Sequence, residues 1–332
     1  MTLNTKILAL DFEVAPCEIS NFDLENILDT SDEWICSRTG IKKRRVLEGD
    51  LSSTDLGISA AKKVIKRCNF DVEKIDLIIA ASSAPEDIYP SVSCLIQNAI
   101  GAFNSAAFDL RAACSGFLYS LSTAKAFIKS GVYKNILIVA TDATTKLTDW
   151  QDRSTCVLFG DGAGAAIVSA VESEKDDIEA VDLIARGDCA NYITLKLQTK
   201  NCPLAKPFQT QYKPYINMKG KDVYKFVMTK IPNAIEKLLE KSNIDKSEID
   251  YFVPHQSNLR MIEALSERLQ FENAKTISNI QNYGNMSAAS IIVAIREGID
   301  KGEIKLPAKF VLSAFGAGMT AANAVINLDK NI

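Results

Sequence analysis

The chain has 332 residues, 47% of them apolar, with a net charge of −3 and an isoelectric point near 5.5. These values are typical of a globular protein with a large core, and they exclude a global basic field that would attract nucleic acid. No apolar run reaches the roughly 18 residues that cross a membrane, and Asp11 and Glu13 interrupt the N-terminal apolar stretch where a secretion signal would be uncharged, so we expect a cytoplasmic protein.

Apolar runs rich in Ile, Val and Leu alternate with segments of helical period, a pattern typical of α/β proteins. In chain order we expect a helix over 54–68, a strand over 76–82, helices over 91–100 and 115–130, strands over 134–141 and 162–170, a helix over 222–242, a strand over 249–253, helices over 257–269 and 287–301, and a strand over 307–314. The polar stretch 187–219 contains three prolines and is expected to connect two halves. We therefore expect an N-terminal half over 1–172, a connecting region over 173–216 and a C-terminal half over 217–332.

The two halves resemble each other in sequence. The strand that begins near Asp76 is similar to the one that begins near Asp250. Cys114 and Asn285 are separated by 171 residues, and the same spacing separates two glycines at the ends of the following helices. The spacing predicts a duplicated fold in which Cys114 and Asn285 are equivalent, with two unrelated strand-helix-strand units as the alternative.

Cysteine and histidine usage limits the chemistry. The eight cysteines are scattered without a C-x-x-C pair and are expected to be reduced thiols, most of them small core residues. A single histidine, His255, excludes sites with several histidine ligands, so we expect no metal and no bound cofactor. Cys114, His255 and Asn285 are the residue types of an activated thiol site. Taken singly, they would be a buried structural cysteine, a core histidine and a helix-capping asparagine.

Cys114 and Asn285 both fall at the start of an expected helix. The unpaired N–H groups and partial positive charge of a helix N-terminus would favour a Cys114 thiolate and could stabilise an oxyanion.

Six motifs, in order along nearly the whole chain, resemble β-ketoacyl-acyl carrier protein synthase III. The runs are Asp29-Thr-Ser-Asp-Glu-Trp-Ile35 with Arg38-Thr-Gly-Ile41, Arg111-Ala-Ala-Cys-Ser-Gly-Phe117, Trp150-Gln-Asp-Arg153, Leu158-Phe-Gly-Asp-Gly-Ala-Gly-Ala165, Pro254-His-Gln-Ser-Asn-Leu-Arg260 and Tyr283-Gly-Asn-Met-Ser-Ala-Ala-Ser290. The resemblance implies a thiolase-like, five-layered αβαβα fold built from two pseudo-twofold related halves.

The resemblance also implies a reaction. Cys114 would take the acyl group of an acyl-CoA primer, acetyl-CoA in the first instance, and the acyl-cysteine would condense with malonyl-acyl carrier protein as carbon dioxide leaves. This decarboxylative Claisen condensation initiates type II fatty-acid synthesis. His255 and Asn285 would stabilise the enolate, and the backbone N–H groups of Cys114 and Ala317 would form the oxyanion hole.

By matched position, five residues would bind coenzyme A. Trp34 and Arg153 would enclose the adenine, Thr30 and Arg38 would hold the nucleotide, and Asn258 would hydrogen-bond the pantetheine. The alternative for Trp34 is a partly exposed packing residue.

The resemblance further implies two protein contacts. Lys219, Lys221, Lys225 and Arg260 would form a basic rim for an acidic carrier protein, although such residues are usually only solvated. Tyr89 would reach across a homodimer interface and close the acyl pocket of the partner, with core packing as its alternative.

Three residues depart from the family pattern. Met286 replaces the usual threonine after Asn285, and Ala321 and Ala322 replace a Trp-Gly pair. We expect these changes to affect the acyl pocket, which leaves open a specialised synthase or acyltransferase that uses a longer or branched acyl group. A papain-like cysteine hydrolase shares the order Cys, His, Asn but not the local motifs, and a non-catalytic binding module is disfavoured because all three residues are present.

Overall fold

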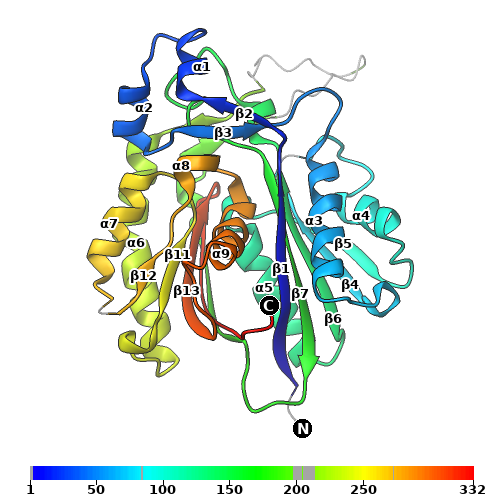
Figure 1. The fold of residues 1–332 in the computed structure, drawn as a ribbon. Helices are drawn as coiled ribbons and strands as arrows, with labels where there is room; N and C mark the ends of the chain where they lie inside the picture. The colour runs from blue at the N-terminus through cyan, green and yellow to red at the C-terminus, as the bar shows by residue number, and fades with distance from the viewer. Residues whose placement is uncertain (1–2, 84, 197–203, 205–213, 272) are drawn as a thin grey trace.

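Two five-stranded sheets form the framework of the fold (Figure 1). The computed structural model describes residues 3–83, 85–196, 204, 214–271 and 273–332. The first sheet has the order β1 (Asn4–Val14), β7 (Gly162–Val171), β6 (Asn135–Asp142), β4 (Leu77–Ala81) and β5 (Ala106–Leu110). The second has the order β12 (Lys275–Thr276), β11 (Tyr251–Pro254), β13 (Ala308–Gly316), β14 (Thr320–Leu328) and β8 (Ile178–Ala185).

Three pairs of helices cover the faces of these sheets. The outer face of the first sheet packs against α3 (Ser53–Arg67) and α4 (Val92–Ile100). The outer face of the second packs against α6 (Gly220–Lys241) and α7 (Leu259–Leu269). Between the sheets lie α5 (Gly116–Lys129) and α9 (Ser290–Asp300). The result is the five-layered αβαβα arrangement predicted from the sequence.

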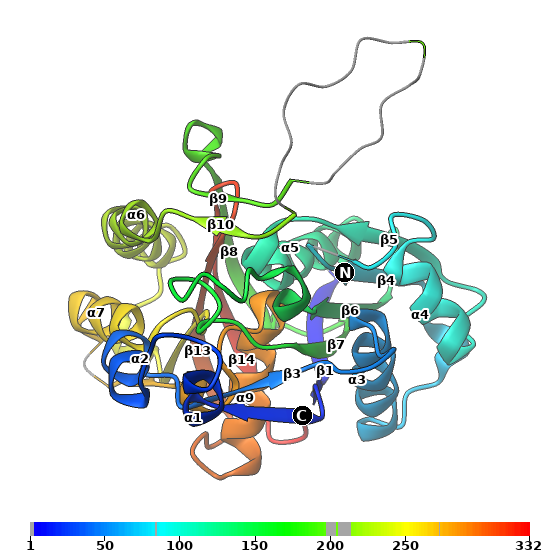
Figure 2. The same ribbon diagram turned by 90° about the horizontal axis from the view of Figure 1, so that it is seen from above.

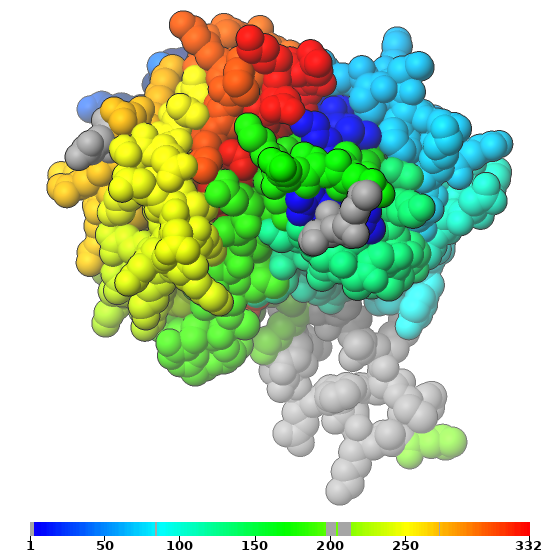
Figure 3. Space-filling view, turned by 90° about the horizontal axis from the view of Figure 1, so that it is seen from below, coloured from blue at the N-terminus to red at the C-terminus, as the bar shows by residue number. Residues whose placement is uncertain are grey.

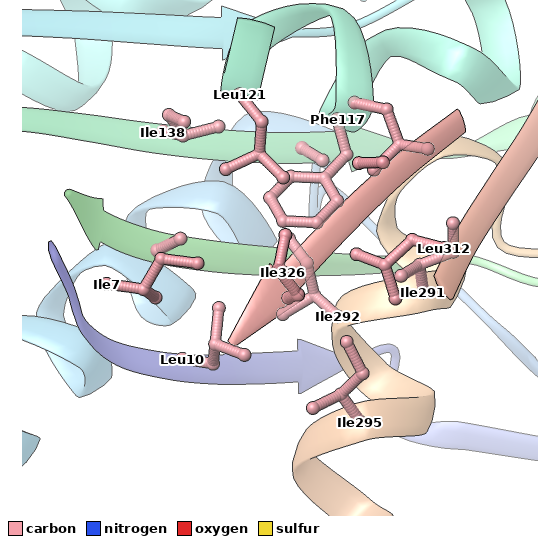
Figure 4. Packing of buried hydrophobic residues seen from close by; sticks show 14 of the residues in the cluster. Ile7, Leu10, Phe117, Leu121, Ile138, Ile291, Ile292, Ile295, Leu312 and Ile326 are labelled. Carbon is pink, nitrogen blue, oxygen red and sulfur yellow. The ribbon is translucent and has the colours of Figure 1, made fainter. Parts of the chain in front are cut away.

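The middle layer holds the largest hydrophobic core. Phe117 and Leu121 of α5 point toward Ile292 and Ile295 of α9, and all four side chains are buried (Figure 4). In α9 every residue from Ser290 to Gly298 is buried, as expected for a helix with protein on all sides. Burying each large apolar side chain contributes roughly 1.5–3 kcal/mol, so this layer joins the two halves firmly.

Smaller elements stand over one end of the sheets (Figure 2). They are the antiparallel pair β2 (Cys17–Ser20) and β3 (Lys43–Val46), the helices α1 (Asn21–Glu25), α2 (Asp32–Thr39) and α8 (Ile280–Tyr283), and the two-stranded sheet of β9 (Ile193–Thr194) and β10 (Asn217–Met218). Arg44 of β3 joins three of these parts, because its fully buried guanidinium donates to the oxygens of Ile19 in β2, Asn21 in α1 and Val157. Burial lowers the pKa of Arg44 to about 10.

The connecting region expected over 173–216 is not wholly a connection. β8 lies inside it and forms the edge of the second sheet, paired antiparallel with β14. Cys202 and the rest of residues 197–203 and 205–213, about half of the polar stretch 187–219, lie outside the described residues. Figure 3 shows the blue and cyan surface of the first half beside the yellow to red surface of the second.

The duplication is real, but its register differs from the prediction by three residues. Short 3-10 turns precede the central helices: η2 (Ala113–Ser115) comes before α5, and η6 (Ser287–Ala289) comes before α9. Both begin with a left-handed residue at φ +48°, and the two starting residues are 174 positions apart. The strands β4 and β11 keep the same offset, as do their pairing partners in β6 and β13.

The equivalent of Cys114 is therefore Ala288, and the prediction that it is Asn285 is wrong. The spacing of 171 holds only at the helix ends, where Gly131 and Gly302 are both left-handed. It differs from 174 because α5 has 14 residues and α9 has 11.

Candidate active site

A cavity of about 1560 Å³ opens where the two halves meet. Its walls include Cys114 from η2, His255 after β11, Asn285 before η6, and Phe315 with Gly316 at the end of β13. The structure thus brings together the three residues predicted to be catalytic, which come from positions up to 171 residues apart in the sequence.

Cys114 is held in place by close backbone packing. Ala113 adopts the left-handed conformation at φ +48°, and η2 then leads directly into the N-terminus of α5. Gly316 lies against this turn, and a Cβ atom at Gly316 would be only 2.6 Å from the backbone nitrogen of Cys114. Only glycine leaves room for this approach, so Gly316 fixes the position of the nucleophile.

The thiol of Cys114 is more strongly protonated than the sequence predicted. Burial raises the pKa of Cys114 to about 12, and the charge of Asp142 acts in the same direction. A hydrogen bond from Ser287 Oγ, 3.6 Å from Sγ, acts in the opposite direction. Cys114 is half-buried at the cavity wall, and this burial opposes the support that the helix N-terminus gives to a resting thiolate.

His255 is almost fully buried, with 1% of its surface exposed. Its backbone nitrogen donates to Ser313 O at 2.7 Å, which fixes the residue at the end of β11. The ring meets Phe315 edge-on with 5.4 Å between centroids, and Nδ1 is 2.8 Å from Ser290 Oγ. Burial lowers the pKa of His255 to about 3, so the imidazole is neutral at physiological pH.

Asn285 is held by both its backbone and its side chain. Its backbone nitrogen donates to Leu158 O at 2.8 Å, and its carbonyl accepts from Gly160 N at 3.0 Å. The side-chain Oδ1 accepts from Ser287 N at 2.8 Å. This bond orients the amide, and within the described residues Nδ2 has no hydrogen-bond acceptor. Nδ2 is therefore the donor that Asn285 offers to the cavity.

The glycine-rich run 159–164 supports this arrangement and holds no phosphate-binding lysine. A Cβ at Gly160 would lie 2.1 Å from Tyr283 O, so the run can pass close to the Asn285 loop. The buried carboxylate of Asp161 accepts from the backbone nitrogens of Leu47 at 2.9 Å and Thr145 at 3.0 Å. The run thus has a structural role beside the active site.

Donors for an oxyanion are also present. Ala317 and Gly318 follow Gly316 in a turn that lines the cavity beside Cys114. Within the described residues, neither the Cys114 nor the Ala317 backbone N–H donates to the carbonyl of another residue. Two unused N–H groups next to a nucleophile are what an oxyanion hole requires.

Four of the five residues predicted to bind coenzyme A line the cavity, namely Trp34, Arg38, Arg153 and Asn258. Asn258 already donates to Arg38 O at 3.0 Å and accepts from the backbone nitrogen of Arg260. Thr30 is not among the lining residues, and its hydroxyl is buried.

The predicted adenine site is closed by its own residues. The guanidinium of Arg153 lies over the ring of Trp34, with Cζ 5.2 Å from the ring centroid. The same guanidinium donates to Asp29 O. An adenine can enter between Trp34 and Arg153 only if Arg153 moves away from the indole.

The residues predicted to form a basic rim are divided between two helices. Arg260 of α7 lines the cavity, whereas Lys219, Lys221 and Lys225 belong to the start of α6 and do not line it. Glu263 and Glu267 of α7 also line the cavity. The α7 side of the cavity therefore carries both basic and acidic side chains.

Tyr89 does not enter the cavity of its own chain. Its side chain is 88% exposed, and the neighbouring Ile88 is 64% exposed. Ile88 lines the cavity, so this segment lies at the rim of the cavity and presents Tyr89 outward. Core packing, the alternative for Tyr89, is excluded in the single chain.

The departures from the family pattern lie away from the cavity. Met286 is fully buried and packs against Gly162, where a Cβ would lie 2.6 Å from its sulfur. Ala321 and Ala322 are buried in β14. None of the three lines the cavity, although Met286 lies between the lining residues Asn285 and Ser287, so an effect on the acyl pocket would act through neighbouring residues.

Three residues near the reacting groups were missed by the sequence analysis. Ser287 and Ser290 stand beside Cys114 and His255, and Asp142 accepts from Ser83 N at 2.8 Å and raises the pKa of Cys114. The two serines follow Asn285 at spacings of two and five, which is the only signal the sequence held. Asp142 belongs to none of the motifs, so only the fold reveals it.

No cluster of three or more metal-ligating side chains exists in the part of the chain that the structure describes. No helix in that part is long and apolar enough to cross a membrane.

Comparison with known proteins gives a consistent result. Two sequence models match the chain: "3-oxoacyl-(acyl-carrier-protein, ACP) synthase III" over residues 108–187, and the C-terminal part of the same family over residues 239–328. The chain is 42% identical over 318 residues to the beta-ketoacyl-(acyl-carrier-protein) synthase III of Clostridium acetobutylicum, covering 94% of this chain and 95% of the relative.

Solved structures agree. The crystal structure of 3-oxoacyl-(acyl-carrier-protein) synthase III from Aquifex aeolicus has a TM-score of 0.89 at 39% identity and covers 98% of this chain and 100% of that chain. The priming beta-ketosynthase of the R1128 polyketide pathway has a TM-score of 0.90 at 29% identity and covers 100% of this chain and 98% of that chain.

Proposed function

The chain belongs to the β-ketoacyl-acyl carrier protein synthase III family of acyl-transferring condensing enzymes, and from this premise we propose how its residues divide the reaction. The observation that carries the proposal is that the thiol of Cys114, the neutral imidazole of His255 and the free Nδ2 of Asn285 share one cavity. One nucleophile and two neutral donors suit a reaction that passes through a thioester and then an enolate.

The first step loads the acyl group on Cys114. The sulfur of Cys114 attacks the carbonyl of an acyl-CoA, the bond between that carbonyl carbon and the coenzyme A sulfur breaks, and the thiol proton of Cys114 ends on the departing coenzyme A sulfur. The oxyanion accepts hydrogen bonds from the N–H groups of Cys114 and Ala317. Because burial disfavours the resting thiolate, the positive end of α5 and the Ser287 hydroxyl assist at the moment of attack.

The second step forms the carbon-carbon bond. Malonyl-acyl carrier protein loses carbon dioxide, and the electron pair of the broken bond becomes an enolate. His255 Nε2 and Asn285 Nδ2 donate hydrogen bonds to the enolate oxygen. The enolate carbon attacks the acyl-cysteine carbonyl, the carbon-sulfur bond breaks, and Cys114 leaves as a thiolate that takes up a proton. Membership of this family rules out the papain-like alternative, and neither step of the condensation requires hydrolysis.

We assign acetyl-CoA as the primer. With this primer the enzyme starts fatty-acid synthesis. The residues that line the cavity limit the length of the acyl group directly, whereas Met286, Ala321 and Ala322 do not line it. The similarity to a priming polyketide ketosynthase keeps a specialised synthase with a longer or branched primer as the second candidate.

Coenzyme A binds along the Trp34, Arg38 and Arg153 wall, and Asn258 offers its remaining amide hydrogen to the pantetheine. Arg153 leaves the Trp34 ring as adenine enters. Thr30 does not line the cavity and its hydroxyl is buried, so a contact with the nucleotide would require its loop to move.

The carrier protein docks at the mouth of the cavity beside α6 and α7. Arg260 is its main contact, because it lines the cavity, and Lys219, Lys221 and Lys225 add attraction at longer range. Glu263 and Glu267 would repel an acidic partner. The positions of the basic side chains therefore matter more for docking than the net charge of the cavity mouth.

The protein acts as a homodimer in the cytoplasm. In the described chain β5 pairs on one side only, with β4, and leaves one edge open. Ile88, Tyr89 and Phe103 are exposed, with values of 64%, 88% and 71%. An open strand edge and exposed apolar side chains favour association. In the dimer Tyr89 closes the acyl pocket of the partner subunit.

The test is to measure the intact mass of the protein after incubation with acyl-CoAs from acetyl to long-chain and branched. We expect an acetyl adduct on Cys114 that malonyl-acyl carrier protein discharges as a ketoacyl product. Preference for a longer or branched adduct would move the assignment to the specialised synthase. No adduct with any acyl-CoA would contradict the condensing function.

A further inference from the structure

The hydroxyl of Ser290 lies against the ring of His255 at the start of α9. Ser290 Oγ is 2.8 Å from His255 Nδ1 and 3.3 Å from the backbone nitrogen of Gln256. His255 and Ser290 are both buried, so water does not compete for these contacts. We propose that Ser290 is a positioning residue that sets the tautomer of His255, with the proton on Nε2 and available to the cavity.

The direction of the hydrogen bonds follows from what each group can donate. The backbone N–H of Gln256 can only donate, so Ser290 Oγ accepts from it. The single hydroxyl hydrogen of Ser290 then needs an acceptor, and within the described residues its contact is His255 Nδ1. If Nδ1 were protonated instead, Ser290 would face two donors and its own hydrogen would be buried without an acceptor. This difference favours the Nε2–H tautomer by roughly tenfold or more.

The surroundings of the ring keep the imidazole neutral. Burial lowers the pKa of His255 to about 3, and its ring neighbour Phe315 carries no charge. A neutral imidazole holds one proton, so the partner of Nδ1 decides which nitrogen carries it. A carboxylate in the place of Ser290 would instead favour the doubly protonated imidazolium.

The first half of the molecule shows that the fold does not require this pair. At the offset of 174 residues, Ala81 is equivalent to His255 and Gly116 to Ser290. Ala81 and Gly116 are in close contact, since a Cβ on Gly116 would lie 2.9 Å from Ala81 Cβ. Two small residues thus fill the same strand-to-helix junction. The hydroxyl of Ser290 has no counterpart there, so its role is toward His255.

The consequence for catalysis rests on the proposed function. With its proton on Nε2, His255 acts as a hydrogen-bond donor to the enolate oxygen beside Asn285 Nδ2. The same tautomer does not accept the proton of Cys114, because Nδ1 is occupied by Ser290 and Nε2 is already protonated. Loss of the Ser290 hydroxyl should therefore slow malonyl decarboxylation more than self-acylation.

The tautomer can be measured directly, because the chain has one histidine. With ¹⁵N-histidine in the wild-type protein at pH 7, the imidazole gives one protonated and one unprotonated nitrogen signal. Couplings to the two ring carbon-bound protons assign each signal to Nδ1 or Nε2. We expect the proton on Nε2. A wild-type spectrum dominated by Nδ1–H would overturn the proposal without any mutation.

The variant Ser290→Ala tests the cause, with Ser120→Ala as its matched control. Ser120 is a buried serine of α5, and its hydroxyl has no hydrogen-bond partner within the described residues. We expect Ser290→Ala to move the tautomer ratio toward Nδ1–H and to slow malonyl decarboxylation roughly tenfold or more, with self-acylation less affected. Ser120→Ala should change neither quantity. A folded Ser290→Ala protein with the wild-type tautomer ratio would contradict the proposal.

The two hypotheses fail in different ways. If no acyl-CoA loads Cys114, the proposed function fails, while the ¹⁵N spectrum still reports the tautomer. If acylation and condensation proceed but the proton lies on Nδ1, the function stands and the role of Ser290 is refuted. If Ser290→Ala does not fold, the wild-type spectrum still decides.

Discussion

The two strand-to-helix junctions at the centre of the molecule have the same backbone and different side chains. In the first half η2 carries Cys114, and in the second half η6 carries Ala288 at the equivalent position. The end of β4 carries Ala81 where β11 is followed by His255, and the end of β6 carries Asp142 where β13 ends in Gly316. The nucleophile thus comes from one junction and the enolate donors from the other.

This difference teaches that the backbone of the junction places few demands on residue type. The central helices bury their sides in both halves, and this packing holds the junctions together whichever side chains they carry. Cys114 and His255 can therefore each be replaced by alanine, the residue at the equivalent position of the other half, with the fold preserved. The substitutions that follow test this similarity of the two junctions, and the strongest loss is expected first.

Cys114→Ala places in the first junction the alanine that the second junction has at position 288. We expect acyl transfer to fall by roughly 10³-fold or more because the nucleophile is lost, while the free energy of unfolding changes by less than about 1 kcal/mol. Intact mass after incubation with acyl-CoA, together with urea unfolding, checks both parts. Cys94→Ala, at an exposed cysteine of α4, is the control and should still be acylated. A stable adduct on Cys114→Ala would remove Cys114 from the mechanism.

His255→Ala gives the second junction the residue found at Ala81, and Asn285→Ala removes the other donor. Each should slow malonyl decarboxylation by roughly 10²–10³-fold, as expected for the loss of one preorganised donor. Self-acylation should be slowed much less, because the Cys114 and Ala317 N–H groups serve that step. Release of carbon dioxide and the rate of acyl adduct formation, measured in parallel, separate the two. Equal losses in both would argue against the division of labour between the halves.

Gly316→Ala tests the close approach that only the second junction provides. The new Cβ would lie 2.6 Å from the Cys114 nitrogen and must displace the nucleophile. A displacement of this kind costs on the order of 10²-fold in rate, so self-acylation should fall by up to that factor. Gly187→Ala is the control, because nothing lies within 4 Å of its new Cβ. Unchanged acylation in Gly316→Ala would show that the junction can relax.

Only the second junction carries a histidine, His255, so its contribution to stability should depend on pH. Unfolded histidine binds a proton below its usual pKa of 6.5, whereas burial keeps folded His255 neutral until about pH 3. Protons therefore favour the unfolded state between these values, and the contribution of His255 to stability is complete above pH 6.5 and is lost as the pH falls.

We expect the wild type to lose about 1–2 kcal/mol more of its unfolding free energy than His255→Ala between pH 6.5 and pH 5. Urea unfolding at the two pH values measures the difference, and His255→Ala supplies the comparison because it carries the residue of the first junction. Parallel pH curves for the two proteins would show that His255 is less buried than its contacts indicate.

The sequence was a good guide to the most apolar elements. The expected helices and strands are all present with ends within three residues of the prediction, since their burial patterns are strong and several are capped by serine or asparagine. The missed elements include β1, β5, β8 and α2. β5 and β8 are edge strands in which most residues are half-buried or exposed, and α2 is short and largely polar, so these three have no strong periodic signal.

The duplication shows how a correct pattern can give a wrong register. The helix ends are easy to find because each is followed by a left-handed glycine, and their spacing was transferred to the helix starts. The starts are left-handed at Ala113 and Ser287, residue types that give no sequence signal for that conformation. A difference of three residues in helix length was therefore invisible before the fold was known.

By itself, the sequence determined the family, the layered α/β class and the residues Cys114, His255 and Asn285, because short motifs carry chemistry that depends on residue type. The tertiary structure decided what depends on neighbours distant in the chain. Burial raised the pKa of Cys114 and kept the imidazole of His255 neutral, Ser287 oriented the amide of Asn285, and Ser290 was placed against the imidazole. Protonation and hydrogen-bond direction are set by solvent exclusion and contact geometry, and only the folded chain creates these.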